Sequence, residues 1–193
     1  MYDMAVFRVV IFACWLAFLG VWVIAAFKAK PSANPRRDRW LVGGIRLVIV
    51  VAVLLALRLH DVRHFLSRPD FAVHDPVAGL IGAALVLPGI GLAIWARLVI
   101  GRNWGHPMTH RENPELVTTG PYSVIRHPIY TGVLTAMLGT AIAIHHILFL
   151  ILLVLAGFFI FSARQEEKRM TLIFPTLYPA YTDRTKMLLP FIF

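Results

Sequence analysis

Two segments hold most of the chain's chemically capable polar residues. Residues 101–130 read GRNWGHPMTHRENPELVTTGPYSVIRHPIY, and residues 162–183 read SARQEEKRMTLIFPTLYPAYTD. Near the end of the first segment, Arg126-His127-Pro128 opens a long apolar run, and proline suits a first helical turn because the amide it lacks would have had no partner there. Such a helix entrance offers unpaired amides and a positive dipole end, which suit a carboxylate or another anion. Any site should therefore be built from these two segments.

A pair of carboxylates lies near the start of the second segment. Glu166 and Glu167 follow the last apolar run by only a few residues. Adjacent residues point to different sides of a helix, so we expect at most one of them to face a given ligand while the other caps, pairs or meets water. The plainer alternative is a solvated helix face, since Lys168 and Arg169 come next.

A combination of motifs links the two segments. The run LVTTGPYSVIRHPIYTG is followed by the EE pair and then by Tyr178 and Tyr181. This pattern, over roughly residues 100–193, resembles the isoprenylcysteine carboxyl methyltransferase family of integral membrane enzymes, which is related to the phospholipid N-methyltransferases. The resemblance implies S-adenosylmethionine as methyl donor and S-adenosylhomocysteine as product. It also implies a cofactor pocket closed by the loop and the tail, and a lipophilic acceptor that enters from the bilayer.

The same resemblance implies roles for individual residues. Glu166 or Glu167 would bind the amino group or a ribose hydroxyl of the cofactor, and the entrance formed by His127 and Pro128 would hold the methionine part together with Tyr130. The remaining candidates would frame the adenine: Leu116, Val117 and Tyr122.

The acceptor decides which further groups the reaction needs. Methyl transfer is an in-line displacement at an activated carbon, so the protein mainly supplies proximity, orientation and exclusion of water, and no metal is required. A carboxylate acceptor needs a positive group to position it, and Arg164 and Arg126 are the candidates; with Glu167 they form the predicted catalytic set. An amine acceptor, as in a phospholipid or lipid-amine N-methyltransferase, would instead need a base such as His127 or a glutamate.

The rest of the chain must hold these segments at a membrane. Its 193 residues are 59% hydrophobic and 15% charged, which excludes a water-soluble globule. Apolar blocks at 5–27, 41–59 and 77–100 are each long enough to span a bilayer, and the first exceeds the apolar core of a cleaved signal peptide. A fourth block, 128–161, should form a hairpin of two spans that turns at His145-His146.

We therefore predict an all-α transmembrane bundle of five spans. Residues 1–100 would form three membrane helices, and residues 101–193 the catalytic region. Most of the 19 Lys and Arg residues fall in three regions: the first loop, between blocks 5–27 and 41–59; the third loop, between blocks 77–100 and 128–161; and the tail that follows residue 161. This bias predicts an external N-terminus, with the third loop, the tail and the cofactor pocket on the cytoplasmic side. The net charge of +9 then indicates an anionic membrane surface rather than nucleic acid as partner; the sequence predicts no oligomeric state.

Several of these residues have plainer alternatives. Arg126-His127 would also serve as the positive flank of a span, and Tyr130, Tyr178 and Tyr181 as tyrosines of the membrane interface. Arg46, Arg58 and Arg97 would also serve as the snorkelling ends of spans.

Two other function classes remain as alternatives. Three histidine pairs resemble the histidine boxes of membrane di-iron oxygenases: His60 with His64, His106 with His110, and His145 with His146. The predicted topology argues against a shared metal, because it separates these pairs across the bilayer. The single cysteine, Cys14, excludes an intrachain disulfide and a multi-thiolate metal site. A non-enzymatic scaffold remains the alternative outside the enzymes.

Overall fold

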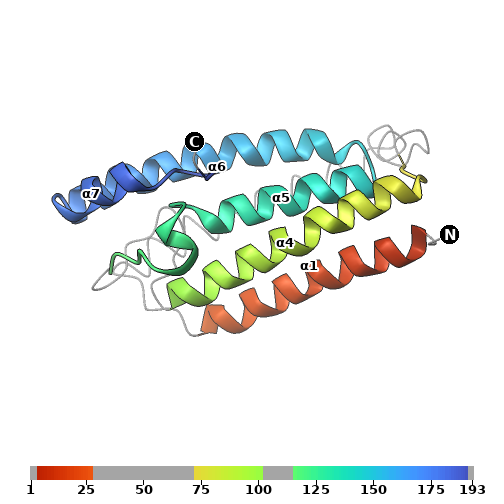
Figure 1. Ribbon diagram of the computed structural model, residues 1–193, viewed down its shortest axis with the longest axis horizontal. Helices are drawn as coiled ribbons and strands as arrows, with labels where there is room; N and C mark the ends of the chain where they lie inside the picture. Colours follow the sequence, from red (N-terminus) through yellow and green to blue (C-terminus); the bar gives the residue numbers. More distant parts are fainter. Residues whose placement is uncertain (1–3, 28–71, 102–114, 191–193) are drawn as a thin grey trace, which may run out of the picture.

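The computed structural model describes residues 4–27, 72–101 and 115–190. These residues form helices and turns, and the part of the chain so described contains no β-strand, only isolated bridges. The elements in chain order are α1 (Met4–Phe27), α4 (Pro76–Ile100), the 3-10 turn η3 (Gly120–Ser123), α5 (Pro128–Ala143), α6 (Leu148–Ile173) and α7 (Leu177–Arg184). Four long helices lie side by side in the order α1, α4, α5 and α6, and α7 extends from the far end of α6 (Figure 1).

The helices agree with the predicted spans in part. Helices α1, α4 and α6 are each long and apolar enough to cross a membrane, and α1 and α4 coincide closely with two of the predicted blocks. The block at 41–59 lies outside the described residues. Helix α5 has 16 residues, fewer than the roughly 20 that a bilayer needs. The count of five spans therefore stays a prediction.

The hairpin expected at the paired histidines is present. Helix α5 ends at Ala143 and α6 begins at Leu148. Between them the chain turns, and the Leu148 amide donates to the His145 carbonyl at 3.0 Å. Helix α6 is longer than predicted, because good helix formers continue past Phe161 and the first proline after it is Pro175. Both glutamates therefore belong to the same rigid helix as the apolar span.

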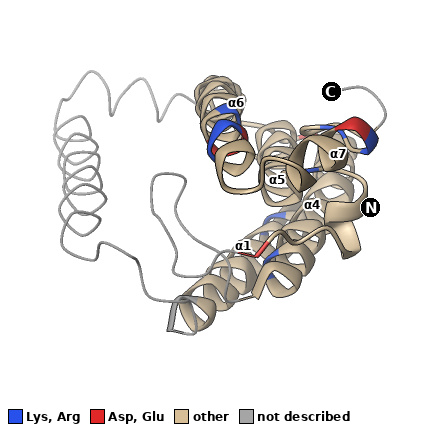
Figure 2. Ribbon diagram, turned by 90° about the vertical axis from the view of Figure 1, so that its left-hand side faces the viewer, with Lys and Arg blue, Asp and Glu red and all other residues tan. Residues whose placement is uncertain are grey.

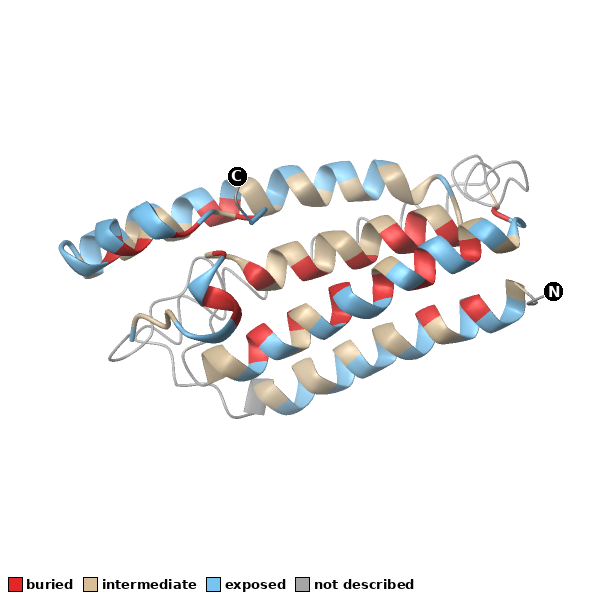
Figure 3. Cartoon of the chain, viewed as in Figure 1, coloured by how far each residue is buried: buried red, intermediate tan, exposed pale blue. Residues whose placement is uncertain are grey.

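Small residues allow α4 and α5 to pack backbone against backbone. A Cβ atom added at Gly89 would lie 2.7 Å from the Ala136 amide nitrogen, and one added at Gly132 would lie 2.5 Å from the Gly89 carbonyl oxygen. Close approach through small residues is how membrane helices gain van der Waals contact where apolar burial offers little gain. The buried residues accordingly gather along the facing sides of α4 and α5 (Figure 3).

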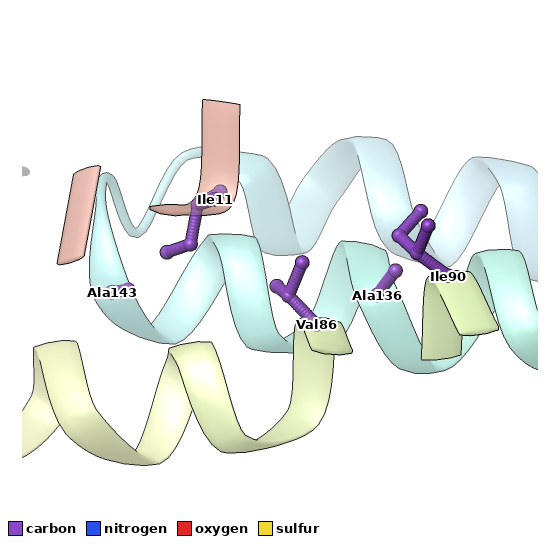
Figure 4. Close-up of a cluster of buried hydrophobic side chains, with 5 residues drawn as sticks. All are labelled: Ile11, Val86, Ile90, Ala136 and Ala143. Carbon is purple, nitrogen blue, oxygen red and sulfur yellow. The ribbon is translucent and has the colours of Figure 1, made fainter. Parts of the chain in front are cut away.

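A small apolar cluster completes the helix contacts. Ile11 of α1, Val86 and Ile90 of α4, and Ala136 and Ala143 of α5 are buried together (Figure 4). The outer faces of α1 and α6 are instead exposed: only 11% of the apolar window of each is buried within the protein. Apolar faces of this length suit contact with lipid chains rather than with water.

Hydrogen bonds at two places along α1 hold this helix against α4 and α5. The Trp15 indole donates to Thr140 Oγ1 at 3.1 Å. Arg97 donates through Nη2 to the Ala25 carbonyl at 3.0 Å and through Nη1 to the Gly101 carbonyl at 2.7 Å. Arg97 is only 2% exposed, so the snorkelling alternative is wrong for this arginine; Arg46 and Arg58 lie outside the described residues. The Arg97 guanidinium instead binds carbonyls at the C-terminal ends of α1 and α4, where helices present unpaired acceptors and a negative dipole end.

Candidate active site at the start of α5

A tight turn leads the chain into α5. Gly120 has φ of 60°, a left-handed conformation that glycine adopts without steric cost, and the Tyr122 amide donates to the Thr119 carbonyl at 3.2 Å. The chain therefore turns sharply at Thr119–Tyr122 before it reaches α5. His127 then forms the N-cap of α5, and Pro128, fully buried, takes its first helical position.

Five side chains from α5, its entrance and α6 meet at this point. The Arg126 Nε donates to Glu167 Oε1 at 2.7 Å, and His127 Nε2 lies 3.2 Å from the same oxygen. His127 Nδ1 lies 3.4 Å from Glu166 Oε2. The Tyr130 hydroxyl donates to Glu166 Oε1 at 2.7 Å. We call these five residues the carboxylate cluster; viewed from the α7 end, the charged residues of α6 and α7 lie at this end of the fold (Figure 2).

Both glutamates face one histidine, His127; which of them faces a bound ligand stays a prediction. Adjacent residues on a helix are rotated by about 100°. The His127 ring lies between the two directions and presents one nitrogen to each carboxylate, at 3.4 Å to Glu166 and 3.2 Å to Glu167.

The cluster is largely shielded from solvent. The side chains of His127, Arg126, Glu167 and Glu166 are 9%, 12%, 18% and 28% exposed. Burial by itself lowers the pKa of His127, but hydrogen bonds and charge from the two glutamates outweigh it and raise the pKa above its ordinary value of 6.5. A neutral imidazole has a single N–H to donate, whereas here both nitrogens face carboxylate oxygens. The geometry therefore favours the imidazolium form.

Aromatic rings border the cluster. The Tyr130 ring stacks between His127 and Phe159, with centroid distances of 5.4 and 4.5 Å. Tyr178 and Tyr181 of α7 are only 4% and 3% exposed, so they do not form part of an interfacial belt. Burial raises the pKa of Tyr181 to about 12, which keeps its hydroxyl protonated as a donor.

The chain after α7 returns to the entrance of α5. Ile125 and Lys186 form a parallel bridge. The Arg126 amide donates to the Lys186 carbonyl at 2.8 Å and the His127 amide to the Met187 carbonyl at 3.1 Å. The amides of Arg126 and His127 are therefore already paired. Pro128 has no amide hydrogen, so the first helical N–H groups at the start of α5 are those of Ile129 and Tyr130. No sequence pattern indicates this contact, because backbone atoms make it.

The other predicted site residues lie in different surroundings. Leu116 and Val117 are half-buried in the segment before η3. Tyr122 is buried, and its hydroxyl donates to the Ala96 carbonyl at 3.4 Å. Arg164 is exposed on α6 and forms no hydrogen bond or ion pair with the residues that the structure describes.

Metal ligands were considered as an alternative in the sequence. Within residues 4–27, 72–101 and 115–190, no group of three His, Cys, Asp or Glu side chains is arranged to hold a metal ion. Four of the histidines of the predicted pairs lie outside the described residues: His60, His64, His106 and His110.

The chain is similar to several known proteins, and the family match covers this part of it. The family described as phospholipid methyltransferase matches residues 77–176, just over half of the chain. The chain is 36% identical over 117 residues to a protein-S-isoprenylcysteine O-methyltransferase of Xenopus laevis, and 31% identical over 127 residues to one of Saccharomyces cerevisiae. It is 31% identical over 152 residues to the cobalt-zinc-cadmium resistance protein CzcN of Cupriavidus metallidurans.

These relatives are longer than the matched regions. The aligned parts cover 58%, 64% and 76% of this chain and 41%, 53% and 62% of the frog, yeast and bacterial proteins. The chain therefore spans about half the length of the curated relatives that it matches. The family match begins in α4 and ends just before α7, so it includes the whole carboxylate cluster.

Proposed function

The chain belongs to the phospholipid methyltransferase family, and from this premise we propose that it is an integral membrane enzyme that transfers a methyl group from S-adenosylmethionine to a lipophilic acceptor. The observation that carries the proposal is the carboxylate cluster. It places two carboxylates at a helix entrance, at one end of three helices that are apolar and long enough to cross a membrane. The family implies the use of S-adenosylmethionine in general, and its use by this chain is part of the proposal.

The residues at the α5 entrance fit such a cofactor. When bound, S-adenosylmethionine supplies a methyl group activated by its sulfonium. Glu166 and Glu167 would hold its cationic amino group or a ribose hydroxyl, and the first amides of α5 would face its carboxylate. Ser162, one turn before Glu166, is 2% exposed, and its Oγ has no hydrogen-bond partner in the described part of the chain. A polar ligand would satisfy this buried hydroxyl.

The other cofactor-binding residues follow the family resemblance. His127, Pro128 and Tyr130 would hold the methionine part. The adenine would lie against Leu116, Val117 and Tyr122. Aromatic and apolar surface of this kind, with a few polar groups that fix orientation, is typical of cofactor pockets.

The cluster favours a carboxylate acceptor over an amine. An amine acceptor needs a base, such as His127 or a glutamate. Both ring nitrogens of His127 face carboxylates and its pKa is raised, so the ring is already protonated and has no lone pair to accept a proton, and the two glutamates are engaged with it. A carboxylate needs only a positioning cation. Arg126 already donates through Nε to Glu167 and through Nη1 to backbone carbonyls, whereas Arg164 is exposed. We assign the acceptor-positioning role to Arg164 and assign Arg126 to holding Glu167.

The expected product is then a methyl ester. The names of the frog and yeast relatives, protein-S-isoprenylcysteine O-methyltransferases, support an oxygen acceptor on a lipidated molecule. The specific alternative is a phospholipid or lipid-amine N-methyltransferase, which the description of the family favours. Mild base distinguishes the two, because it releases methanol from a methyl ester and leaves a methylamine intact.

The orientation of the protein in the membrane is also a proposal, and it rests on the Lys and Arg residues of the loops. We place the N-terminus outside and the carboxylate cluster with the C-terminal tail on the cytoplasmic side.

Calorimetric titration of S-adenosylhomocysteine into the detergent-purified protein tests the proposal without knowledge of the acceptor. Saturable one-to-one binding is expected, and Glu166→Gln, Glu167→Gln and His127→Ala should each weaken it at least tenfold, about 1.4 kcal/mol. Asp183→Asn is the matched control: it removes an exposed carboxylate of α7 that forms no ion pair among the described residues. If the folded wild-type protein does not bind S-adenosylhomocysteine, the proposal that the chain is a methyltransferase is overturned, and a non-enzymatic scaffold is favoured.

A further inference from the structure

The C-terminal clasp, residues 177–188, consists of α7 and the extended segment that follows it. This part of the chain lies beyond the residues that the family matches, which end at 176. It nevertheless contacts the start of α5 at several points. Two of its carbonyls, those of Lys186 and Met187, accept the amides of Arg126 and His127 at 2.8 and 3.1 Å.

The clasp also holds the guanidinium of Arg126. Its Nη1 donates to the Thr182 carbonyl at 3.4 Å and, through a shorter bond, to the Thr185 carbonyl. Both carbonyls lie at the C-terminal end of α7, where a helix presents unpaired acceptors and a negative dipole end. The same guanidinium donates through Nε to Glu167. Arg126 therefore connects the end of the clasp to the carboxylate cluster.

Two hydroxyl groups secure the clasp through side-chain bonds. Thr131 Oγ1, one turn into α5, donates to the Leu188 carbonyl at 2.6 Å. The Tyr181 hydroxyl donates to the Tyr122 carbonyl at 2.6 Å. One bond thus ties the last residue of the clasp to α5, and the other ties α7 to the turn that precedes α5. Neither hydroxyl touches the carboxylates.

We propose that the clasp is a positioning part of the cofactor site, with Thr131 and Tyr181 as positioning residues that act through His127, Arg126 and the η3 turn. This inference rests on the proposed function. The clasp holds the backbone of Arg126 and His127 and the Nη1 of Arg126, while Glu166 and Glu167 bind the side chains of these two residues. With the clasp in place, both carboxylates are held in one orientation before any ligand arrives, which lowers the ordering cost of binding.

Removal of single hydroxyls tests this role. Thr131→Val removes the donor to Leu188, and Thr131→Ser retains it. Tyr181→Phe removes the donor to the Tyr122 carbonyl with little change of shape. Thr140→Val is the matched control, because Thr140 also lies on α5 and bonds through its hydroxyl to Trp15 and Ala136, roughly 13 Å further along the helix axis.

The measurement is the dissociation constant of S-adenosylhomocysteine for each folded variant, with the melting temperature measured in parallel. Thr131→Val and Tyr181→Phe should each raise the dissociation constant three- to tenfold, the range expected for loss of one hydrogen bond. Thr131→Ser should bind like wild type. Thr140→Val should lower the melting temperature and leave the dissociation constant unchanged.

The outcomes separate this inference from the proposed function. Wild-type binding together with unchanged affinity in Thr131→Val and Tyr181→Phe would overturn the clasp alone. An equal loss of affinity in Thr140→Val would also overturn it, because the effect would then follow general stability. Absence of binding by the wild-type protein would overturn the proposed function, and the clasp inference with it.

Discussion

The ion pair between Arg126 and Glu167 should be a measurable source of stability. Its N–O distance is 2.7 Å, and the two side chains are 12% and 18% exposed. Charge centres about 4 Å apart attract by about 4 kcal/mol at an effective dielectric constant near 20, and desolvation of both groups offsets much of this. Net values for hydrogen bonds to charged groups run from about 1.5 to 3 kcal/mol. Because each partner keeps other bonds, we expect a coupling energy near the lower end, about 1.5 kcal/mol.

A double-mutant cycle measures this coupling. Wild type, Arg126→Met, Glu167→Gln and the double variant are unfolded at equilibrium in the same mixed micelles, and the non-additive part of the free energy of unfolding is the coupling. Arg126→Met combined with Asp75→Asn is the control, since Asp75 caps the opposite end of the bundle at α4 and distant sites add within about 0.5 kcal/mol. A coupling for the Arg126–Glu167 pair no larger than that of the control would refute the reasoning.

Three further outcomes follow from the packing and the charges. The raised pKa of His127 means that its stabilising contribution is complete below about pH 6.5 and is lost as pH rises through the folded-state pKa. The free energy of unfolding should therefore fall as pH rises above about 6.5, and His127→Gln should flatten the profile. Gly89→Ala should lower the free energy of unfolding by about 1–3 kcal/mol, because the added Cβ would lie 2.7 Å from a backbone nitrogen of α5. Gly91→Ala, where the added Cβ meets open space, should be neutral or slightly stabilising in the same unfolding assay. Arg97→Met should lower the free energy of unfolding by about 2–4 kcal/mol, because it leaves the carbonyls of Ala25 and Gly101 without their charged donor. An unchanged midpoint would contradict the assigned role of this arginine.

Much of the site could be predicted from the sequence because its residues are local in the chain. Arg126, His127 and Tyr130 lie within one turn of each other, at a proline that marks a helix start. Glu166 and Glu167 lie next to one another, shortly after an apolar span. Their meeting follows from the hairpin, since two helices joined by a short turn return the chain to the level at which the first began. Their individual roles toward the cofactor stay predictions.

Other features depended on contacts that a sequence pattern does not encode. In the sequence, Arg97 cannot be distinguished from an arginine that snorkels at the end of a membrane span. It is buried because its guanidinium bonds to carbonyls at the C-terminal ends of α1 and α4. Tyr178 and Tyr181 resemble interfacial residues in the sequence, but the tertiary structure buries both, and the Tyr181 hydroxyl bonds to the Tyr122 carbonyl of η3.

The sequence by itself determined that the chain is helical and apolar enough to cross a membrane, where the hairpin between α5 and α6 turns, and which short segments are proposed to carry the chemistry. These properties follow from hydropathy, proline placement and residue type, which act over one or two helical turns. Three features were decided by the tertiary structure alone. Both glutamates contact His127, Arg126 forms hydrogen bonds within the protein, and residues 185–188 bond to the start of α5. The physical reason is that these contacts join residues more than 35 positions apart, largely through backbone atoms or side-chain directions that are set only when the helices pack.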